Sequence, residues 1–574
     1  MGCTAVVNTI LPELTAPSPP SGLPAEISPI LDACLGGDPA EVRIQRVESI
    51  LAGEGGESVR AALGSWIAQM VSIDSLVPET YCQWRPLVRD SIQFLFSNLS
   101  PERLAAKIVE QVDLPLDEPP ARRLLELIAR MPAIQKLGQI LARHQRLDPS
   151  VRKALSELEN GMRDASPKSI RAIIAKELGP RLRKYAVRVD RAIFSEASVS
   201  AVIRFTYCVS GGREPGAKPR EHGVFKVIKP HVRDYFTEDL TLLHQLSDFL
   251  AKSQEYGFAT RHVAEMVSEV RLLLEHELDF EREQATLLEA ARTYRNNAVV
   301  RVPRLVAALC TPEIIAMSEV PGIKVTEVFQ QRPYWRRLVA EQLVEALVTV
   351  PLLSRESSVL FHADPHAGNL LYDERDGKIG ILDWALAARL SRDLRRRLAL
   401  LVIMTVLRNS GGVKDALVKL ASPGERRDKE KVRLIEEHVD RFFKELPYNR
   451  FAGSLDAMLL LDEIALAGVR FPANLAMFQK ALFTLDGVLH DIAGSEVSVS
   501  YLIVRDFVIR LLVSFGLDHP PLSVCDLMAV ERSGLLYPSR LGLSALSGVR
   551  SKREAPPPQA PPAPFTDNHE VVPC

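Results

Sequence analysis

The sequence feature that most constrains this chain is a polar segment at 361–371, FHADPHAGNLL, followed by Ile-Leu-Asp-Trp at 381–384. The residues between contain two apolar runs separated by an Asp-Gly pair, which is a common hairpin turn signal. We therefore predict a hairpin with strands at 370–372 and 379–382 and a turn at 373–378. Such a hairpin constrains the fold because it determines which polar side chains meet at its open end.

The predicted hairpin brings Asn369 and Asp383 side by side at that open end. Asp364 precedes Asn369 on the loop that enters the first strand. Two carboxylates and one amide oxygen can therefore converge on a small volume. Hard oxygen ligands of this kind suit magnesium bound to nucleotide phosphates.

A second interpretation of the same loop is a metal-dependent hydrolase. His362, Asp364 and His366 alternate along the chain, and imidazole and carboxylate groups suit zinc. A hydrolase of this kind would give no role to Asn369 or to Asp383. We therefore treat it as the weaker alternative.

The order of Asp, four residues, Asn, a hairpin and then Asp is similar to the catalytic loop and metal-binding aspartate of the protein-kinase fold. The sequence HADPHAGNLL resembles a motif of the UbiB/AarF (ABC1-type) family of atypical kinases. This family is associated with coenzyme Q and other prenyl-lipid metabolism. The resemblance implies that Asp364 is the catalytic-loop aspartate, Asn369 a metal ligand and Asp383 the principal magnesium ligand. The family usually has Phe-Gly after this aspartate, whereas this chain has Trp384-Ala385. We expect the missing glycine to affect the mobility of the loop.

Lys136-Leu137-Gly138-Gln139 resembles the KxGQ motif of the UbiB family's helical extension. Phosphotransferases of the aminoglycoside and choline kinase type share a similar His-x-Asp loop but lack this motif. Glu277 and Asp279 resemble the family's ExD element. By resemblance, Lys136 and Gln139 would face these acids and restrict access, which implies a small, lipidic or internal substrate.

The segment at 224–228, Val-Phe-Lys-Val-Ile, predicts a buried strand with Lys226 at its centre, and a buried lysine needs a partner. The resemblance implies that Lys226 reaches the α and β phosphates and pairs with Glu283, on a helix expected over about 262–294. Glu196 stands in a loop where the family is rich in alanine. An acid beside phosphates is repulsive unless it points away or meets metal. The nucleotide-binding residues implied by the resemblance are Ser195, Ala197, Ser198, Lys226, Met317 and Glu319.

The composition excludes some classes of protein. Lys+Arg 71 against Asp+Glu 72 gives a net charge of -1, so there is no global electrostatic case for nucleic-acid binding. The 7 cysteines show no CxxC spacing and predict free thiols in a reducing compartment. No secretory signal and no apolar run long enough to span a membrane is apparent, which favours a cytoplasmic protein. A peripheral membrane contact remains an open alternative.

We predict an α+β protein with a bilobal, protein-kinase-like fold and a helical N-terminal extension. The expected parts are a flexible leader with a weak helix at 1–56, the helical extension with the KxGQ motif at 57–184 and a β-rich lobe at 185–322. A helical lobe with the catalytic and metal loops follows at 323–545, and a disordered Pro-rich tail at 546–574.

The function implied by the resemblance is that of a magnesium-dependent, ATP-binding atypical kinase or ATPase that supports isoprenoid-quinone or lipid metabolism. The implied partners are nucleotide and proteins of prenyl-lipid or quinone pathways. Two alternatives stay open: a nucleotide-binding pseudokinase that acts as a regulatory or scaffold module, and a small-molecule phosphotransferase of the aminoglycoside or choline kinase type.

Overall fold

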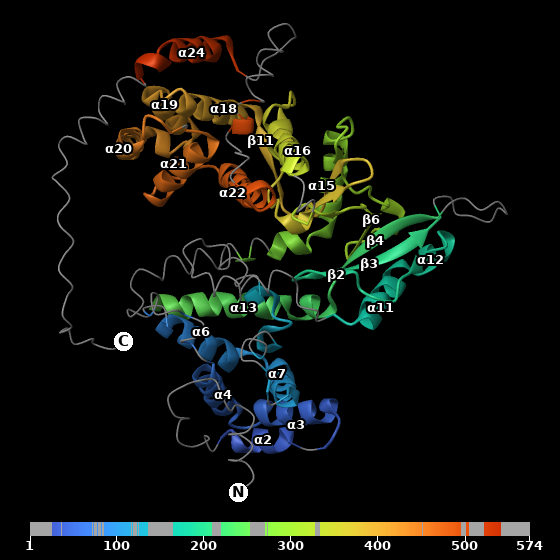
Figure 1. Cartoon of the computed structure of the whole chain (residues 1–574). Coiled ribbons are helices and arrows are strands. Elements are labelled where there is room, and N and C mark those ends of the chain that lie inside the picture. Colours follow the sequence, from blue (N-terminus) through green and yellow to red (C-terminus); the bar gives the residue numbers. More distant parts are fainter. Residues whose placement is uncertain are drawn as a thin grey trace, which may run out of the picture. The chain divides into compact units, whose positions relative to one another are not determined.

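The computed structural model of the chain forms two compact units (Figure 1). The first unit comprises 1–280, 306–316 and 572–574, and the second comprises 281–305 and 317–571. The structure describes residues 26–135, 165–208, 220–252, 270–327, 333–494 and 501–540, apart from gaps at 36, 72, 74–76, 78–81, 83–84, 116, 119–122, 124–125, 272–273, 451, 504 and 506–521. The β-rich lobe expected at 185–322 is thus divided between the two units.

The N-terminal part of the first unit is helical, and its helices begin within the segment 1–56 that was predicted as a leader. Its helices are α2 (Ser28–Cys34), α3 (Ala40–Ala52), α4 (Gly56–Met70), α6 (Arg85–Asn98) and α7 (Pro101–Asp113). Gly64 lets α4 and α6 approach closely, because a Cβ there would lie 2.1 Å from Ser97 Oγ. Leu63 and Ile67 of α4 are buried.

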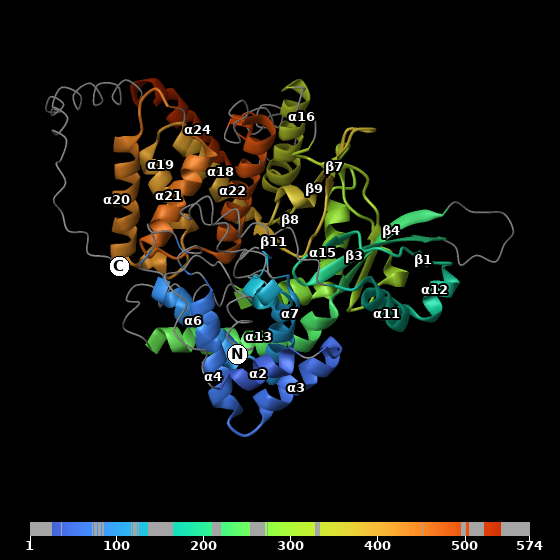
Figure 2. The same ribbon diagram turned by 60° about the horizontal axis from the view of Figure 1, so that its bottom comes forward.

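These helices dock on α13 (Pro230–Lys252), the long helix of the same unit (Figure 2). Arg103 of α7 forms ion pairs with Asp239 at 2.6 Å and with Glu238 at 3.2 Å. The Phe94 ring of α6 stacks on Phe249 of α13, with centroids 4.9 Å apart. A buried charge cluster and an aromatic contact therefore join the helical extension to the helix that follows the Lys226 strand.

The main sheet of the first unit has the order β1-β3-β4-β6, with β2 paired to β3. Its strands are β1 (Arg188–Val189), β2 (Ser195–Glu196), β3 (Ser200–Tyr207), β4 (Glu221–Ile228) and β6 (Ile314–Ser318). α11 (Pro167–Leu178) covers one face of this sheet, where Ile174 meets Phe205, Phe225 and Val227 in one core (Figure 1). Because side chains alternate along a strand, Lys226 points to the other face.

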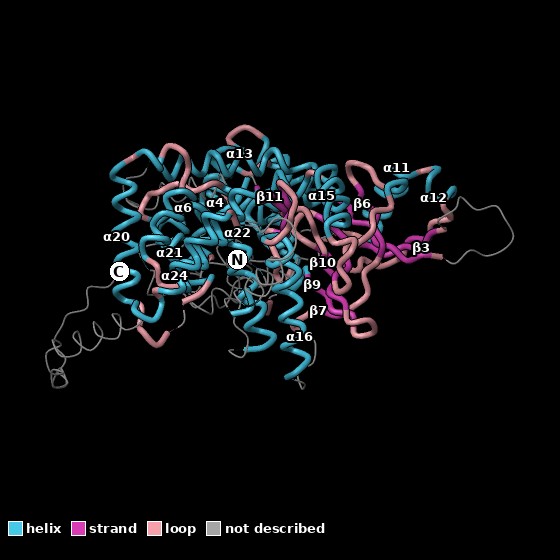
Figure 3. The backbone as a smooth tube through the Cα atoms, turned by 90° about the horizontal axis from the view of Figure 1, so that it is seen from above, coloured by secondary structure: helices cyan, strands magenta, loops and turns pink. Residues whose placement is uncertain are grey.

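The second unit contains the predicted hairpin. Its small sheet has the order β5-β10-β9-β7 (Figure 3). The strands are β5 (Val300–Arg301), β7 (Ile323–Lys324), β9 (Leu370–Asp373) and β10 (Lys378–Ile381). Ile381 pairs with Leu370 and Lys378 with Asp373, which confirms the predicted hairpin with strand ends shifted by one residue. β8 (Ser358–His362) and β11 (Ala387–Ser391) form a separate two-stranded sheet. The polar loop follows β8, and the loop that contains Asp383 precedes β11.

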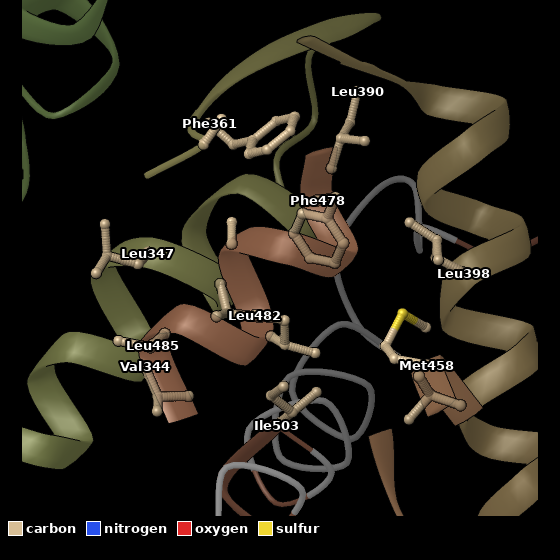
Figure 4. Packing of buried hydrophobic residues seen from close by; sticks show 14 of the residues in the cluster. Val344, Leu347, Phe361, Leu390, Leu398, Met458, Phe478, Leu482, Leu485 and Ile503 are labelled. Atoms are coloured by element: carbon tan, nitrogen blue, oxygen red, sulfur yellow. The ribbon is translucent and has the colours of Figure 1, made fainter. Parts of the chain in front are cut away.

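Helices supply most of the second unit. They are α15 (Phe280–Thr293), α16 (Pro333–Val344), α17 (Val350–Leu352), α18 (Arg392–Val406), α19 (Ser410–Leu420), α20 (Lys429–Glu445), α21 (Ser454–Leu466), α22 (Ala473–Ala493) and α24 (Val524–Leu535), with a π-helical turn at Glu345–Thr349. Phe361 of β8 meets Phe478 of α22 edge-on, with ring centroids 5.4 Å apart (Figure 4). Leu482 and Leu485 extend this core along α22 (Figure 4). The strand that leads into the polar loop is therefore fixed by the helical core.

The helix predicted over 262–294 is interrupted in the structure. α15 begins at Phe280, the preceding helical residues end at Leu278, and Asp279 between them is not helical. The early part of the prediction, 262–269, lies outside the described residues. In the part of the chain that the structure describes, no helix has the length and apolar character needed to cross a membrane.

Candidate functional site

The polar loop after β8 is closed by backbone and side-chain hydrogen bonds. The His366 N–H donates to the Asp364 carbonyl at 2.9 Å, and the Asn369 N–H donates to the His366 carbonyl at 2.9 Å. The Asn369 side-chain amide also donates to the Asp364 carbonyl, at 3.2 Å. This bond fixes the orientation of the amide group, so that its oxygen is the atom left to act as a ligand.

The open end of the hairpin brings the second polar segment beside Asn369. The Leu382 N–H donates to the Asn369 carbonyl at 2.8 Å, which extends the β9–β10 ladder by one bond. The next residue, Asp383, has a φ of 47°. This left-handed conformation is uncommon outside glycine, although Asp tolerates it better than most residues. The Asp383 carboxylate accepts a hydrogen bond from the Ala385 N–H at 3.2 Å, which stabilises the turn.

His362 connects the two polar loops. Its Nδ1 accepts a hydrogen bond from the Asp364 N–H at 3.3 Å, so its Nε2 carries the proton and donates to the Leu382 carbonyl at 2.9 Å. Burial lowers the pKa of His362, while the bond to Leu382 and the charges of Asp364 and Asp383 act in the opposite direction. A neutral imidazole is thus held between the two loops, and both carboxylates lie within electrostatic reach of it.

Trp384 anchors the loop that carries Asp383. Its indole is buried and donates from Nε1 to the Ile381 carbonyl at 3.2 Å. The ring also lies 6.0 Å from that of Tyr294, whose hydroxyl donates to the Ala346 carbonyl at 2.7 Å. Where the UbiB family has Phe-Gly, this chain therefore has a large aromatic residue held by packing and by a hydrogen bond.

The donor set at the hairpin fits magnesium better than zinc. Asn369 and Asp383 offer amide and carboxylate oxygens, which magnesium prefers together with phosphate oxygens. Both ring nitrogens of His362 are already engaged with the backbone. Within the described residues no group of three or more His, Cys, Asp or Glu is arranged to hold a metal ion. The occupied nitrogens of His362 thus speak against the zinc interpretation.

In the first unit, Lys226 is buried on β4, as predicted for a strand lysine. Its Nζ lies 5.6 Å from the centroid of the Phe280 ring, within the range of a cation–π interaction. Lys226 is paired in register with Val202 of β3, and Ser200 lies two residues before Val202 on the same face. Glu283, its expected partner, is buried in the first turn of α15 in the second unit. Their ion pair stays a prediction.

Glu196, the acid predicted in a loop, is the last residue of strand β2, and its charge is neutralised within the first unit. Its carboxylate forms an ion pair with Lys229 at 3.1 Å, and the two side chains are only 6% and 1% exposed. The same carboxylate accepts a hydrogen bond from the Ala165 N–H at 3.2 Å. The repulsion expected from an acid in this loop is thus offset by a buried lysine.

The rest of this loop contacts the ExD element. The Ser198 hydroxyl donates to Glu277 at 3.2 Å, whereas Ser195, Ala197 and Asp279 are exposed. A tight turn closes the loop, because the Ala197 N–H donates to the Ser200 carbonyl at 2.8 Å. Two motifs that lie far apart in the sequence are therefore in direct contact.

The remaining predicted residues are placed as follows. Lys136 and Gln139 lie outside the described residues, so their contact with Glu277 and Asp279 stays a prediction. Met317 is partly buried against the core of the second unit, and Glu319 is half-buried.

Sequence reasoning missed two residues and misassigned a third. Lys229 received no role, although a lysine directly after an apolar strand and before a proline was a visible signal. Tyr294 gave no signal, because its contact with Trp384 depends on the tertiary fold. His362 was considered only as a zinc ligand, whereas it connects the two loops.

Comparison with known proteins finds a matching family model and several similar sequences. Residues 157–417 match the family model described as the ABC1 atypical kinase-like domain. A probable protein kinase UbiB from Histophilus somni is 28% identical over 271 residues, which cover 46% of this chain and 48% of that protein. A probable protein kinase UbiB from Haemophilus ducreyi is 29% identical over 291 residues, which cover 49% of this chain and 52% of that protein. The chain spans about half the length of the curated relatives it matches.

One similar solved structure is the complex of Rv3197 with erythromycin from Mycobacterium tuberculosis. The similarity has a TM-score of 0.40 at 18% sequence identity, and it covers 62% of this chain and 87% of that chain. The class defined by the matched domain is that of the kinase-like proteins with an α+β fold. More narrowly, residues 157–417 resemble the ABC1 atypical kinase-like domain, and the chain is similar to proteins named as probable protein kinase UbiB.

Proposed function

We propose that this protein binds ATP with magnesium and transfers the γ-phosphoryl group to water or to a small acceptor. The observation that carries the proposal is the arrangement of Asp364, Asn369 and Asp383 about one hairpin end, with His362 bonded to both loops. Similarity to proteins named as probable protein kinases supports the same reaction class.

In this proposal, each residue has a separate role. Asn369 and Asp383 would hold magnesium, which would neutralise charge on the phosphate oxygens. Asp364 orients the acceptor hydroxyl or water and accepts its proton. Lys226 contacts the α and β phosphates, and Glu283 pairs with Lys226 to position it. His362 positions Asp364 and Leu382 without exchanging a proton, because burial favours its neutral form.

The proposed acceptor is small or lipidic, and the proposed role lies in isoprenoid-quinone or lipid metabolism. The contact between Ser198 and Glu277 supports this, because it holds the ExD element against the proposed phosphate loop, where it would narrow access for a protein substrate.

Phosphate release from Mg-ATP, measured beside nucleotide binding, tests the reaction. We expect slow release by the wild type, a loss of about 100-fold or more in Asp364→Asn, and retained nucleotide affinity in that variant. Asp462→Asn, on the exposed surface of α21, is the matched control and should leave both values unchanged. Binding without release in the wild type would contradict catalysis and favour a nucleotide-binding pseudokinase.

A further inference from the structure

The outer face of α11 and of the short helix that follows it, α12 (Pro180–Lys184), is strongly basic. The two helices contact each other beside the main sheet of the first unit (Figure 1, Figure 2). Glu177 is the one acidic residue in the two helices. Their basic residues are all exposed, and we call them the α11–α12 basic face: Lys168, Arg171, Lys176, Arg181, Arg183 and Lys184.

The packing of the two helices explains why these cations face outward. Ile170 and Ile174 of α11 are buried in the core that the helix shares with the sheet. Residues three or four apart share one face of a helix, so Lys168 and Ala172 lie together on the opposite, exposed face. Leu182 of α12 packs against the same core. The cations therefore point away from the sheet, and no large apolar side chain stands between those of α11.

Carboxylates of the protein do not neutralise this face. Among the residues that the structure describes, none of the six cations forms an ion pair, and Arg181 donates to the Cys310 carbonyl at 3.2 Å. The exposed helix α20 differs, because it balances its 5 Lys and Arg with 5 Asp and Glu, and Arg433 pairs there with Glu437 at 2.8 Å. The α11–α12 basic face is therefore a local excess of positive charge on a chain whose net charge is -1.

We propose that the α11–α12 basic face binds the phosphate headgroups of an anionic phospholipid membrane. Clusters of about four to eight Lys or Arg on an exposed helix attract anionic lipid surfaces, and this face has six such residues. Headgroup phosphates require only long cationic side chains on a convex surface. Nucleic-acid sites usually add aromatic or amide side chains that stack on bases or read their edges, and α11 and α12 contain none. A membrane is therefore the polyanion that this face fits best.

This contact is separate from the proposed nucleotide site. α11 covers the face of the sheet that carries Phe205 and Phe225, whereas Lys226 points to the other face. A membrane bound at the α11–α12 basic face would thus not cover Lys226. The inference goes beyond the proposed function and does not depend on it.

Sedimentation of the full chain with lipid vesicles tests the inference. The vesicles are pure phosphatidylcholine or phosphatidylcholine mixed with phosphatidylglycerol, which is anionic. We expect the wild type to bind the mixed vesicles and not the neutral ones. Binding should be lost as salt is raised from about 0.1 M to about 0.5 M, because the attraction is between exposed charges.

A triple variant of α11 locates the contact. Gln is a helix former similar to Lys and Arg, so these exposed substitutions should leave the melting temperature unchanged. Each removed cation should weaken vesicle binding about fivefold, which gives roughly 100-fold for three. The variant is Lys168→Gln/Arg171→Gln/Lys176→Gln.

A matched control removes the same charge from α20. Its three substitutions change exposed residues of a helix whose charges are balanced, so vesicle binding should stay that of the wild type. The control is Lys429→Gln/Arg433→Gln/Arg441→Gln. If the α11 variant melts below the wild type, Arg183→Gln/Lys184→Gln on α12 provides the same test, with an expected loss of about 25-fold.

Each outcome decides the inference. A wild type that ignores anionic vesicles, or equal losses in the α11 variant and the α20 control, would overturn it. A wild type that binds duplex DNA more tightly than anionic vesicles, with DNA binding lost in the α11 variant, would assign the face to nucleic acid instead. Vesicle binding that depends on the α11 cations in a protein that does not bind Mg-ADP would support this inference and overturn only the proposed function.

Discussion

The imidazole of His362 lies edge-on to the indole of Trp384, with ring centroids 5.0 Å apart and an interplanar angle of 73°. This geometry is one that aromatic rings favour over face-to-face stacking. The contact joins the loop of Asp364 to the loop of Asp383 through two buried side chains. The two proposed functional segments are therefore held together by packing as well as by the hydrogen bond from His362 to Leu382.

Trp384→Phe tests this packing. The substitution keeps an aromatic ring but removes the hydrogen bond to Ile381 and leaves space beside Tyr294. We expect it to reduce the free energy of unfolding by about 1–3 kcal/mol in urea titrations. Trp335→Phe, at a partly exposed site on α16, should change it by less than about 0.5 kcal/mol. Equal effects of the two substitutions would contradict the anchoring role.

The Glu196–Lys229 pair predicts strong coupling in a double-mutant cycle. Glu196→Leu or Lys229→Met alone leaves one buried charge without its partner, so each should cost about 3–5 kcal/mol of stability. The double variant should cost clearly less than the sum, because no charge is then left behind. It should also keep its affinity for Mg-ADP, since the pair is structural. Additive losses, or lost nucleotide binding in a folded double variant, would show that this assignment is wrong.

Lys107 predicts a pH dependence in the helical extension. Burial, followed by the charge of Arg130, lowers the pKa of Lys107 to about 7 from the ordinary 10.5, although its Nζ donates to the Glu126 and Ala129 carbonyls. Between these two values the unfolded chain binds more protons at this site than the folded chain. Stability contributed by this residue should therefore rise as the pH increases from about 7 to about 10.

Comparison with Lys107→Met checks this sign. Met has a similar length and no charge, so the variant lacks the titration. As the pH is raised from 7 to 9, the melting temperature of the wild type should rise relative to that of the variant. A difference that is constant over this range would contradict the lowered pKa of Lys107.

The hairpin at the site could be predicted because its signals are local. The Asp-Gly turn and the two apolar runs around it determine the register, and the register places Asn369 beside Leu382. The buried strand of Lys226 was predictable for the same reason, since a single charge in an apolar run is visible in the sequence.

Contacts set by the tertiary fold could not be predicted in this way. Glu196 was interpreted as an acid beside phosphates because its partner, Lys229, is far away in the sequence. Lys229 follows the end of β4 and meets Glu196 only in the folded chain. The helix break at Asp279 interrupts a continuous charged pattern. The left-handed φ of Asp383 has no local sequence signal such as glycine.

The most direct test of the central claim is thermal unfolding with ADP, with and without magnesium, for wild type, Asp383→Asn and the surface control Asp462→Asn. At 100 times the dissociation constant, bound nucleotide should stabilise the wild type by about 2.7 kcal/mol. We predict a magnesium-dependent rise in melting temperature for wild type and Asp462→Asn that is lost in Asp383→Asn. A wild type with no magnesium-dependent shift at millimolar ADP would contradict the nucleotide site.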